Sequence, residues 1–242
     1  MKIVKYEKVG KNKYKVYLEN GDTLILYEDI ILKYELLITK EIDDIELIEK
    51  ENIKYELYDK VLGFISKRIR CESEIRKYLQ KYTSDLKYID NIIDKLYQNK
   101  LLDNELYIKS FIHDKINFTN DGPIKIKKNL EDLKFDSFLI DDMLIEFNSK
   151  IQNEKINNYI EKNLKSNTKS LYVFKQKMLI NLINLGYYKE NIISVLDKIN
   201  FNDSEERDKE IDKLRNKYSK KYQGRELEYF IKRKLYEKGF RD

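Results

Sequence analysis

An apolar pattern that returns after about 50 residues constrains the fold of this 242-residue chain more than any other feature. Residues 126–144 and 178–196 match at an offset of 52, with apolar or aromatic residues at six shared positions: Ile126, Leu130, Leu133, Phe135, Ile140 and Leu144, and then Met178, Leu182, Leu185, Tyr187, Ile192 and Leu196. The pattern starts earlier and continues later at offsets of 51 and 53: Ile75 and Leu79, Ile231 and Leu235. Steps of three and four residues predict helices with one buried face. We therefore predict stacked helical repeats that bury each other's apolar faces.

Helix-starting and helix-ending residues divide the chain into these repeats. Asp43-Asp44 and Asp103-Asn104 suit helix N-termini, Pro123 suits the first position of a helix, and Gly239 suits the residue after a helix end. After Asp44 we expect two helices, over 44–51 and 55–67. The predicted fold class is mainly α, with tandem three-helix repeats in a curved array and a small N-terminal β-hairpin module. The predicted boundaries are 1–42 for the module, 43–102, 103–148 and 149–201 for three repeats, and 202–242 for a partial fourth.

The N-terminal module is predicted from alternating residues on both sides of Asn20-Gly21. The flanking segments Lys13–Leu18 and Thr23–Tyr27 are rich in β-prone residues, and Asn-Gly between such segments favours a type I′ hairpin turn. Lys2–Lys8 is the candidate third strand. A module of about 40 residues has too small a core to be stable alone, so we expect it to dock on the first helices.

Composition indicates a soluble, mildly basic protein. Charged residues make up 38% of the chain, the formal net charge is +5 and the isoelectric point is near 8.8. This balance permits contact with nucleic acid or an acidic protein, but it falls short of the value above about 9 typical of a dedicated nucleic-acid domain. One cysteine excludes an intramolecular disulfide, and no stretch resembles a signal peptide or a membrane span. We expect a cytoplasmic monomer that does not contact membranes.

Residues suited to catalysis are scarce. His113 and Cys71 are the only histidine and the only cysteine, and we expect a surface side chain and a helix cap respectively. The acidic pairs Asp43-Asp44 and Asp141-Asp142 point about 100° apart if they lie on helices, so we interpret them as caps and solvated surface. No glycine-rich phosphate loop is present. The sequence predicts a protein that is not an enzyme and holds no cofactor or metal.

Basic residues gather around the second helix of each predicted repeat. We predict partner binding by a broken basic stripe whose members are Arg68, Arg70, Arg76, Lys77, Lys125, Lys127, Lys128, Lys175 and Lys177. The correspondence is imperfect, because an offset of 52 takes Lys127 and Lys128 to Leu179 and Ile180. Two alternatives remain open. These side chains could be ordinary solvated surface, and Arg68 or Arg70 could pair within its own repeat with Glu72 or Glu74.

Four segments resemble the motifs of the RecX family of bacterial recombinase modulators. The match is in order over roughly residues 55–200, and it consists of Arg68-x-Arg70-Cys71-x-x-Glu74-Ile75-x-x-x-Leu79, Leu101-Leu102-Asp103-Asn104-x-x-Tyr107, Gly122-Pro123-x-Lys125-Ile126-x-x-x-Leu130 and Leu182-x-x-Leu185-Gly186-Tyr187-x-x-x-x-Ile192. The N-terminal hairpin is similar to an extension found in Firmicute members. The departures are Cys71 for a capping serine, Asn104 for a second aspartate and Lys134-Phe135 for Gly-Ile.

The resemblance implies a curved array of three-helix repeats that lies along the groove of the RecA–DNA filament. Such proteins restrain strand exchange and the coprotease activity of the filament, in DNA repair and the SOS response. The implied partners are RecA and, in some members, single- or double-stranded DNA. Two other interpretations stay open: a sequence-nonspecific DNA-binding protein of tandem helix-turn-helix-like units, and a scaffolding repeat with an unrelated partner.

Overall fold

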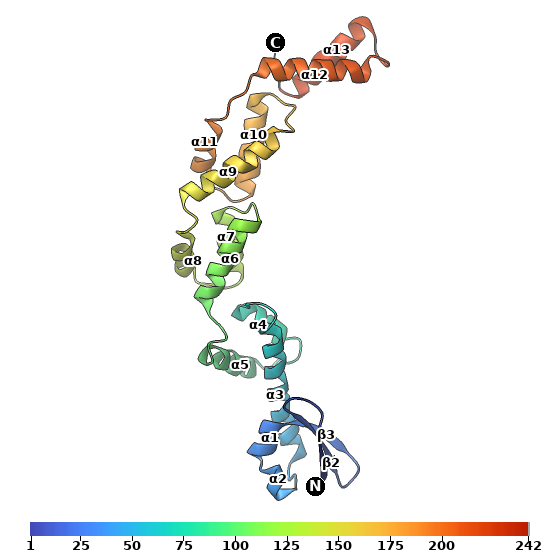
Figure 1. Ribbon diagram of the computed structural model, residues 1–242, viewed down its shortest axis with the longest axis vertical. Coiled ribbons are helices and arrows are strands. Elements are labelled where there is room, and N and C mark those ends of the chain that lie inside the picture. The colour runs from blue at the N-terminus through green and yellow to red at the C-terminus, as the bar shows by residue number, and fades with distance from the viewer. Residues whose placement is uncertain (242) are drawn as a thin grey trace. The chain divides into compact units, whose positions relative to one another are not determined.

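The computed structural model describes residues 1–241 and confirms the predicted fold class. The described residues form thirteen helices and one three-stranded antiparallel sheet, which lies at the N-terminus (Figure 1). The chain divides into two compact units, Met1–Asp103 and Asn104–Asp242. We call them unit 1 and unit 2 and describe each by itself. The repeat boundaries stay a prediction.

The sheet of unit 1 contains β1 (Ile3–Lys8), β2 (Lys13–Leu18) and β3 (Thr23–Tyr27), in the order β1-β2-β3. The predicted hairpin and third strand are therefore confirmed. The predicted type I′ turn is wrong. The Gly21 N–H donates to the Leu18 carbonyl at 3.0 Å, the Leu18 N–H donates to the Asp22 carbonyl at 2.9 Å, and Gly21 has a φ of 91°. This is a three-residue loop in which only the glycine is left-handed.

Burial of the sheet explains the longer loop. The observed register places Val16 opposite Leu24 and Tyr14 opposite Leu26, so these four apolar side chains share one face. A two-residue turn at Asn20-Gly21 would slip this pairing by one residue and turn Leu24 and Leu26 away from Val16. The register that buries one face of the sheet therefore selects the turn.

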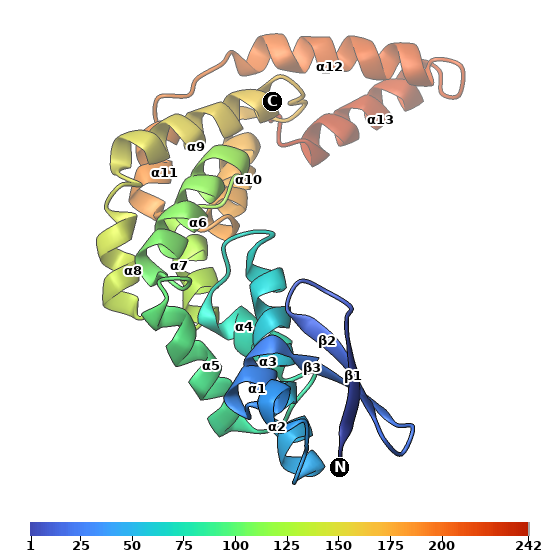
Figure 2. The same cartoon turned by 60° about the horizontal axis from the view of Figure 1, so that its bottom comes forward.

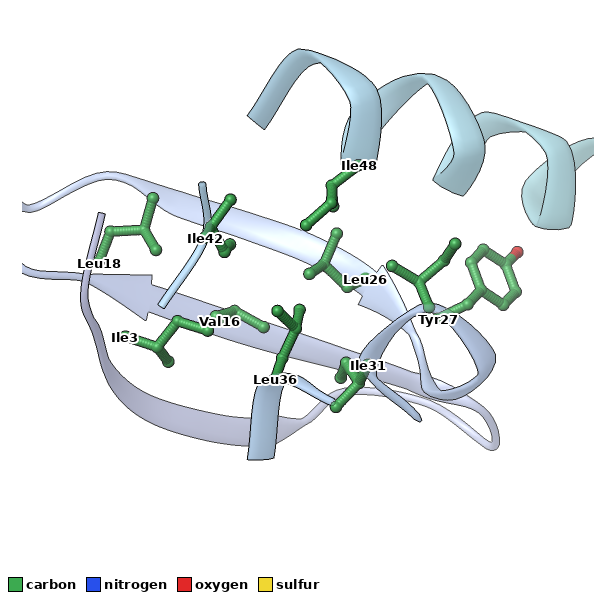
Figure 3. Close-up of a cluster of buried hydrophobic side chains, with 10 residues drawn as sticks. Ile3, Val16, Leu18, Leu26, Tyr27, Ile31, Leu36, Ile42 and Ile48 are labelled. Atoms are coloured by element: carbon green, nitrogen blue, oxygen red, sulfur yellow. The ribbon is translucent and has the colours of Figure 1, made fainter. Parts of the chain in front are cut away.

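The buried face of this sheet is covered by helices. Val16, Leu18 and Leu26 pack against side chains of α1 (Glu28–Lys33), α2 (Leu36–Thr39) and Ile48 of α3 (Ile45–Ile65), as Figure 3 shows. Asn52 of α3 adds a polar contact to β3. Its Oδ1 accepts the Tyr27 N–H at 2.8 Å and its Nδ2 donates to the Ile25 carbonyl at 2.8 Å. The expected docking of the N-terminal module on the first helix is confirmed.

The α3 helix corrects the prediction of two helices over 44–51 and 55–67. It is one continuous helix of 21 residues, and Asp44 caps its start by accepting the Leu47 N–H at 3.0 Å. The predicted gap between the two helices contains Asn52, whose short amide side chain favours turns over helix interiors. In the structure that amide bonds the edge of β3, so it does not compete with the backbone of its own helix.

The second half of α3 packs with α4 (Glu72–Leu79) and α5 (Leu86–Gln98) in unit 1. Their shared core consists of Leu57, Val61, Ile75, Leu79, Ile89, Ile92, Ile93, Leu96 and Leu102. The residues of α4 and α5 in this core follow the three- and four-residue spacing seen in the sequence. Unit 1 therefore joins a sheet core and a helical core along one long helix.

Unit 2 contains two helix triplets and a final pair (Figures 1 and 2). The triplets are α6 (Asn104–Phe118), α7 (Pro123–Asp132) and α8 (Ser137–Leu144), then α9 (Ser149–Leu164), α10 (Leu171–Asn184) and α11 (Lys189–Leu196); the pair is α12 (Asp203–Tyr218) and α13 (Gly224–Glu237). Pro123 occupies the first turn of α7, as predicted. Residues at equivalent positions are buried alike: Ile126, Leu130, Ile140, Met178, Leu182 and Ile192 have no exposed surface.

Three of these helices end in the same way. After α7, α10 and α13, a residue with φ of 71° to 88° is followed by an aromatic residue: Lys134 and Phe135, Gly186 and Tyr187, Gly239 and Phe240. The aromatic N–H donates to a carbonyl five residues earlier, on Leu130, Leu182 and Leu235, at 3.3, 3.1 and 3.1 Å. This left-handed ending with a buried apolar contact is a Schellman motif. It explains the predicted role of Gly239.

The start of one such helix lies against the end of the next. The Gly122 N–H, at the start of α7, donates to the Leu185 carbonyl at 2.7 Å, and the Ile124 N–H donates to the Gly186 carbonyl at 3.0 Å. A Cβ atom on Gly122 would lie 2.5 Å from the Gly186 carbonyl carbon. Backbone groups that helix ends leave unpaired therefore satisfy each other, with the helix dipoles head to tail.

The contact recurs one triplet later. The Ser170 N–H, at the start of α10, donates to the Lys238 carbonyl at the end of α13 at 3.1 Å. A Cβ atom on Gly239 would lie 2.2 Å from Cγ2 of Val173. In both contacts a glycine allows one helix start to approach the end of another helix closely. We call these the glycine-backed contacts, and they show that α7, α10 and α13 are equivalent elements.

We expect Gly122→Ala to destabilise the protein by about 1–3 kcal/mol, because the added methyl group would overlap the backbone at Gly186. Gly63→Ala is the matched control. Gly63 lies in α3 with open space around its Cα atom, so alanine should stabilise by about 0.5–1 kcal/mol through helix propensity. Urea unfolding of both variants measures the difference. Equal effects would contradict the close contact.

We expect Leu130→Ala and Leu182→Ala each to lower the free energy of unfolding by about 2–5 kcal/mol, because both side chains are fully buried. Leu86→Ala, at a position of α5 that is 60% exposed, serves as the control and should change little. Thermal and urea unfolding supply the measurement. A Leu130 or Leu182 variant as stable as the control would contradict the equivalence of the repeats.

Candidate partner-binding surface

The corner between α3 and α4 brings Arg68 and Arg70 together on one carboxylate. Oε1 of Glu74 accepts from Nη2 of Arg68 at 2.5 Å and from Nη1 of Arg70 at 3.3 Å. Its Oε2 accepts the Cys71 N–H at 3.2 Å, at the start of α4. Burial alone would raise the pKa of Glu74, but the Cys71 N–H and the two arginines outweigh it and hold the pKa below its ordinary value. The alternative in which these arginines pair within their own repeat is confirmed for Glu74.

Arg70 is also held by aromatic rings. Its guanidinium carbon lies 3.9 Å from the centre of the Phe64 ring, which stacks on Tyr78 at 4.3 Å with the two planes 2° apart. Only 15% of the Arg70 side chain is exposed. This stack fixes the corner between α3 and α4, and Arg70 is part of the packed structure there.

Arg76 and Lys127 make equivalent ion pairs in neighbouring triplets. Arg76 of α4 contacts Asp90 of α5 at 2.6 Å, and Lys127 of α7 contacts Asp141 of α8 at 2.6 Å. Arg76 and Lys127 are 51 residues apart, and so are Asp90 and Asp141. The offset of 52 between the second and third triplets takes Lys127 and Asp141 to Leu179 and Ile193. An ion pair in two triplets is thus replaced by two apolar residues in the third. The position joins the second helix of a triplet to its third helix.

Lys125, in the first turn of α7, belongs to a charged cluster around the buried carboxylate of Asp121. It pairs with Asp121 at 2.6 Å, and Lys115 of α6 contacts the same carboxylate at 3.0 Å. Burial would raise the pKa of Asp121, but the hydrogen bonds from Lys125 and Lys115 lower it below the ordinary value. The cluster fixes the chain just before the contact of Gly122 with Gly186.

Lys155 of α9 binds backbone carbonyl groups at the C-terminal end of α6. Its ammonium group donates to the carbonyls of Ile116 and Thr119, the latter at 2.9 Å. Burial lowers the pKa of Lys155, and the charge of Asp121 opposes that shift. A lysine that was not among the predicted residues therefore joins two triplets.

Four of the nine predicted cations have no ion pair among residues 1–241: Lys77, Lys128, Lys175 and Lys177. Lys77, Lys128 and Lys177 are exposed and Lys175 is half-buried. Lys77 and Lys128 are equivalent at an offset of 51, as are Lys125 and Lys177 at 52. The second helices of successive triplets therefore present lysine ammonium groups to solvent.

Apolar side chains that the sequence interpretation did not select lie on the same helices of unit 2. Tyr172, Ile180 and Ile183 of α10 are 70%, 57% and 45% exposed, and Ile124 of α7 is 48% exposed. The steps of eight and three residues place the three α10 side chains on one helix face, with Lys175 and Lys177 on either side of it. That spacing was available in the sequence. We call Ile124, Lys128, Tyr172, Lys175, Lys177 and Ile180 the outer face of unit 2.

The residues considered for chemistry lie apart. His113 is exposed and its Nε2 lies 2.9 Å from Nδ2 of Asn117, whereas Cys71 is buried at the N-cap of α4, as expected. Within residues 1–241, no group of three or more histidine, cysteine, aspartate or glutamate side chains is arranged to hold a metal ion. None of the helices described is long and apolar enough to span a bilayer.

The fold and the outer face define a helical-repeat protein with a small N-terminal sheet and an exposed surface of lysine and apolar side chains. No protein-family model matches the chain. A regulatory protein RecX of Streptococcus agalactiae serotype Ia is 31% identical over 99% of this chain and 95% of its own length. A regulatory protein RecX of Oceanobacillus iheyensis is 28% identical over 97% and 91%. The chain belongs to the RecX family of regulatory proteins, as the motifs predicted.

Solved structures agree with this fold. A crystal structure of a regulatory protein RecX superposes with a TM-score of 0.70 at 24% identity, covering 81% of this chain and 99% of that one. A crystal structure of RecX from Lactobacillus salivarius gives a TM-score of 0.55 at 28% identity, covering 60% and 97%. The arrangement of the helices is therefore shared with proteins of the family.

We expect Asp121→Asn to lower the free energy of unfolding at neutral pH by about 1–3 kcal/mol, because Lys115 and Lys125 lose their shared carboxylate. The pKa of Asp121 is lowered in the folded state, so the unfolded chain takes up this proton at higher pH. The contribution is therefore present above about pH 4 and is lost as the pH falls through the folded-state pKa.

Urea unfolding between neutral and acidic pH tests this, with Asp132→Asn, an exposed position of α7, as the control. The stability difference between wild type and the Asp121 variant should shrink on acidification. A difference that is independent of pH would contradict the role of the carboxylate.

Proposed function

We propose that this chain is a non-enzymatic regulator that binds the RecA–DNA filament and mostly inhibits its recombinase and coprotease activities in DNA repair. Membership of the RecX family supports a regulatory role. The observation that carries the proposal is the outer face of unit 2, where lysines without ion pairs among the described residues stand beside exposed apolar side chains. Such a combination suits a protein partner with acidic groups around an apolar patch.

A repeated surface suits a repeated partner. Lys128 of α7 and Lys177 of α10 lie on equivalent second helices, and the glycine-backed contact fixes the two helices end to end. Contacts presented on one rigid frame add through effective concentration, so each one can be weak. A filament of identical protomers offers the same acidic groups at a regular spacing, which is the partner this arrangement favours.

The nine predicted cations divide into two roles under this proposal. Lys77, Lys128, Lys175 and Lys177 contact the partner. The remaining five, Arg68, Arg70, Arg76, Lys125 and Lys127, are held by acidic side chains and keep the helices that carry the first four in place. Their substitution would impair binding indirectly, through the fold.

The test is a triple variant, Lys128→Glu, Lys175→Glu and Lys177→Glu. We expect unchanged helical content and loss of inhibition of RecA-driven strand exchange, because three attractive contacts become repulsive. The matched control, Lys109→Glu, Lys150→Glu and Lys162→Glu, changes the net charge equally on α6 and α9, where these lysines are exposed. It should inhibit nearly as well as wild type.

Direct binding assays separate the alternative, sequence-nonspecific DNA binding. The proposal expects binding to the RecA filament to be lost in the outer-face variant at salt concentrations where the free protein does not bind DNA. A folded triple variant that inhibits at the wild-type concentration would refute the proposed surface. Equal loss in the control variant would show a general charge effect instead.

A further inference from the structure

A pocket in unit 1 lies between α3 and α5. It has a volume of about 260 Å³ and is lined by Glu51, Lys54, Tyr55 and Tyr58 of α3, by Tyr88, Asn91, Ile92 and Lys95 of α5, and by Lys33 of α1. Each of the two long helices contributes residues at positions i, i+3, i+4 and i+7, so each presents one continuous face. The pocket is therefore formed by the packing of regular elements.

The lining carries unbalanced positive charge. Glu51 is its only carboxylate, and Lys33 neutralises it at 2.5 Å. Lys54 and Lys95 have no ion pair among the described residues. Their ammonium groups lie over tyrosine rings instead, Lys54 at 5.7 Å from the centre of Tyr88 and Lys95 at 4.5 Å from that of Tyr58. The charge of Lys54 also helps to lower the pKa of Glu51, but neither Lys54 nor Lys95 forms an ion pair within the described residues.

The tyrosines supply flat surface and hydrogen-bond donors. Among residues 1–241, the hydroxyl groups of Tyr55 and Tyr88 have no hydrogen-bond partner, whereas that of Tyr58 accepts from Nδ2 of Asn99 at 3.0 Å. Burial raises the pKa of Tyr88, and the neighbouring Tyr55 and Asp85 add to the shift. The Tyr88 hydroxyl therefore stays protonated over the physiological range and can donate to an anion.

We propose that this pocket binds a nucleoside phosphate, with the phosphate between Lys54 and Lys95 and the base against the tyrosine rings. A phosphate is a stronger partner for an ammonium group than a ring face, so both lysines can leave the rings when it binds. The vacated rings then stack on the base, which every base permits through its flat face. The volume of about 260 Å³ lies just below the range of about 300–1,000 Å³ typical of small-molecule sites, so the pocket suits a ligand no larger than one nucleotide unit.

An acidic peptide fits the pocket less well. Its carboxylates would satisfy the two lysines, but a flexible acidic side chain leaves the three tyrosine rings without a stacking partner. The combination of paired cations and aromatic faces therefore favours the nucleoside phosphate. Its source is either a free nucleotide or one unit of a single strand, and both present the same chemistry.

Isothermal titration calorimetry with the full-length protein tests the proposal. The ligands are dTMP, ATP, a thymidine octanucleotide, thymidine, inorganic phosphate and a hexaglutamate peptide. We expect at least one of the first three to bind at least roughly tenfold more tightly than thymidine or phosphate alone, since the pocket contacts both base and phosphate. Preference for the octanucleotide or for the free nucleotides identifies the source.

The variant for this test is Lys54→Glu with Lys95→Glu, and the control is Lys87→Glu with Lys50→Glu, exposed positions on the same two helices. The pocket variant should weaken nucleotide binding by roughly tenfold or more while the control stays within about twofold. Tyr88→Phe should weaken it less, since it removes one donor and keeps the ring. Equal binding by wild type and the pocket variant would overturn the proposal, as would inorganic phosphate or a hexaglutamate peptide binding as tightly as every nucleotide.

Discussion

Unit 2 depends on backbone contact between the end of one helix and the start of another. Gly122 and Gly186 allow α7 and α10 to approach until N–H and carbonyl groups bond across the junction, and Ser170 and Gly239 repeat the arrangement between α10 and α13. A side chain at either glycine would separate the backbones. The junction pairs N–H groups at a helix start with carbonyl groups at a helix end. It therefore fixes the relative direction of the two helices as well as the distance between them. The side chains of the outer face take their positions from these junctions.

Internal ion pairs separate the cations that hold the fold from those that face solvent. Arg76 and Lys127 each join a second helix to a third helix, and Arg68 and Arg70 share Glu74. The more exposed pairs, Arg76–Asp90 and Lys127–Asp141, contribute little stability each but orient one helix against the next. Arg70 and Glu74, by contrast, are largely buried at the corner between α3 and α4. The lysines that directly follow Arg76 and Lys127 in the sequence, Lys77 and Lys128, have no such partner among the described residues. A binding surface supported by neighbouring ion pairs is thereby kept in one orientation.

The apolar pattern determined the fold class, because a helix buries one face whatever its neighbours are. Leu130 and Leu182 were paired by sequence offset alone and are equally buried. The predictions of a type I′ turn at Asn20-Gly21 and of a helix break near Asn52 were wrong for the same reason. In both places a local preference for a turn competed with a tertiary contact, the burial of Leu24 and Leu26 in one case and the hydrogen bonds from Asn52 to β3 in the other.

For the site, the sequence determined which residues are basic and which helices carry them, since composition and periodicity are local properties. Tertiary structure decided which of those charges are already neutralised. Asp141 is 14 residues from Lys127 and Glu74 is six from Arg68, and many other acidic residues lie equally near in the sequence. Which acid a lysine or arginine meets depends on how the helices pack. The pocket between α3 and α5 depends on the same packing, because its α3 residues and its α5 residues are 30 or more positions apart in the sequence.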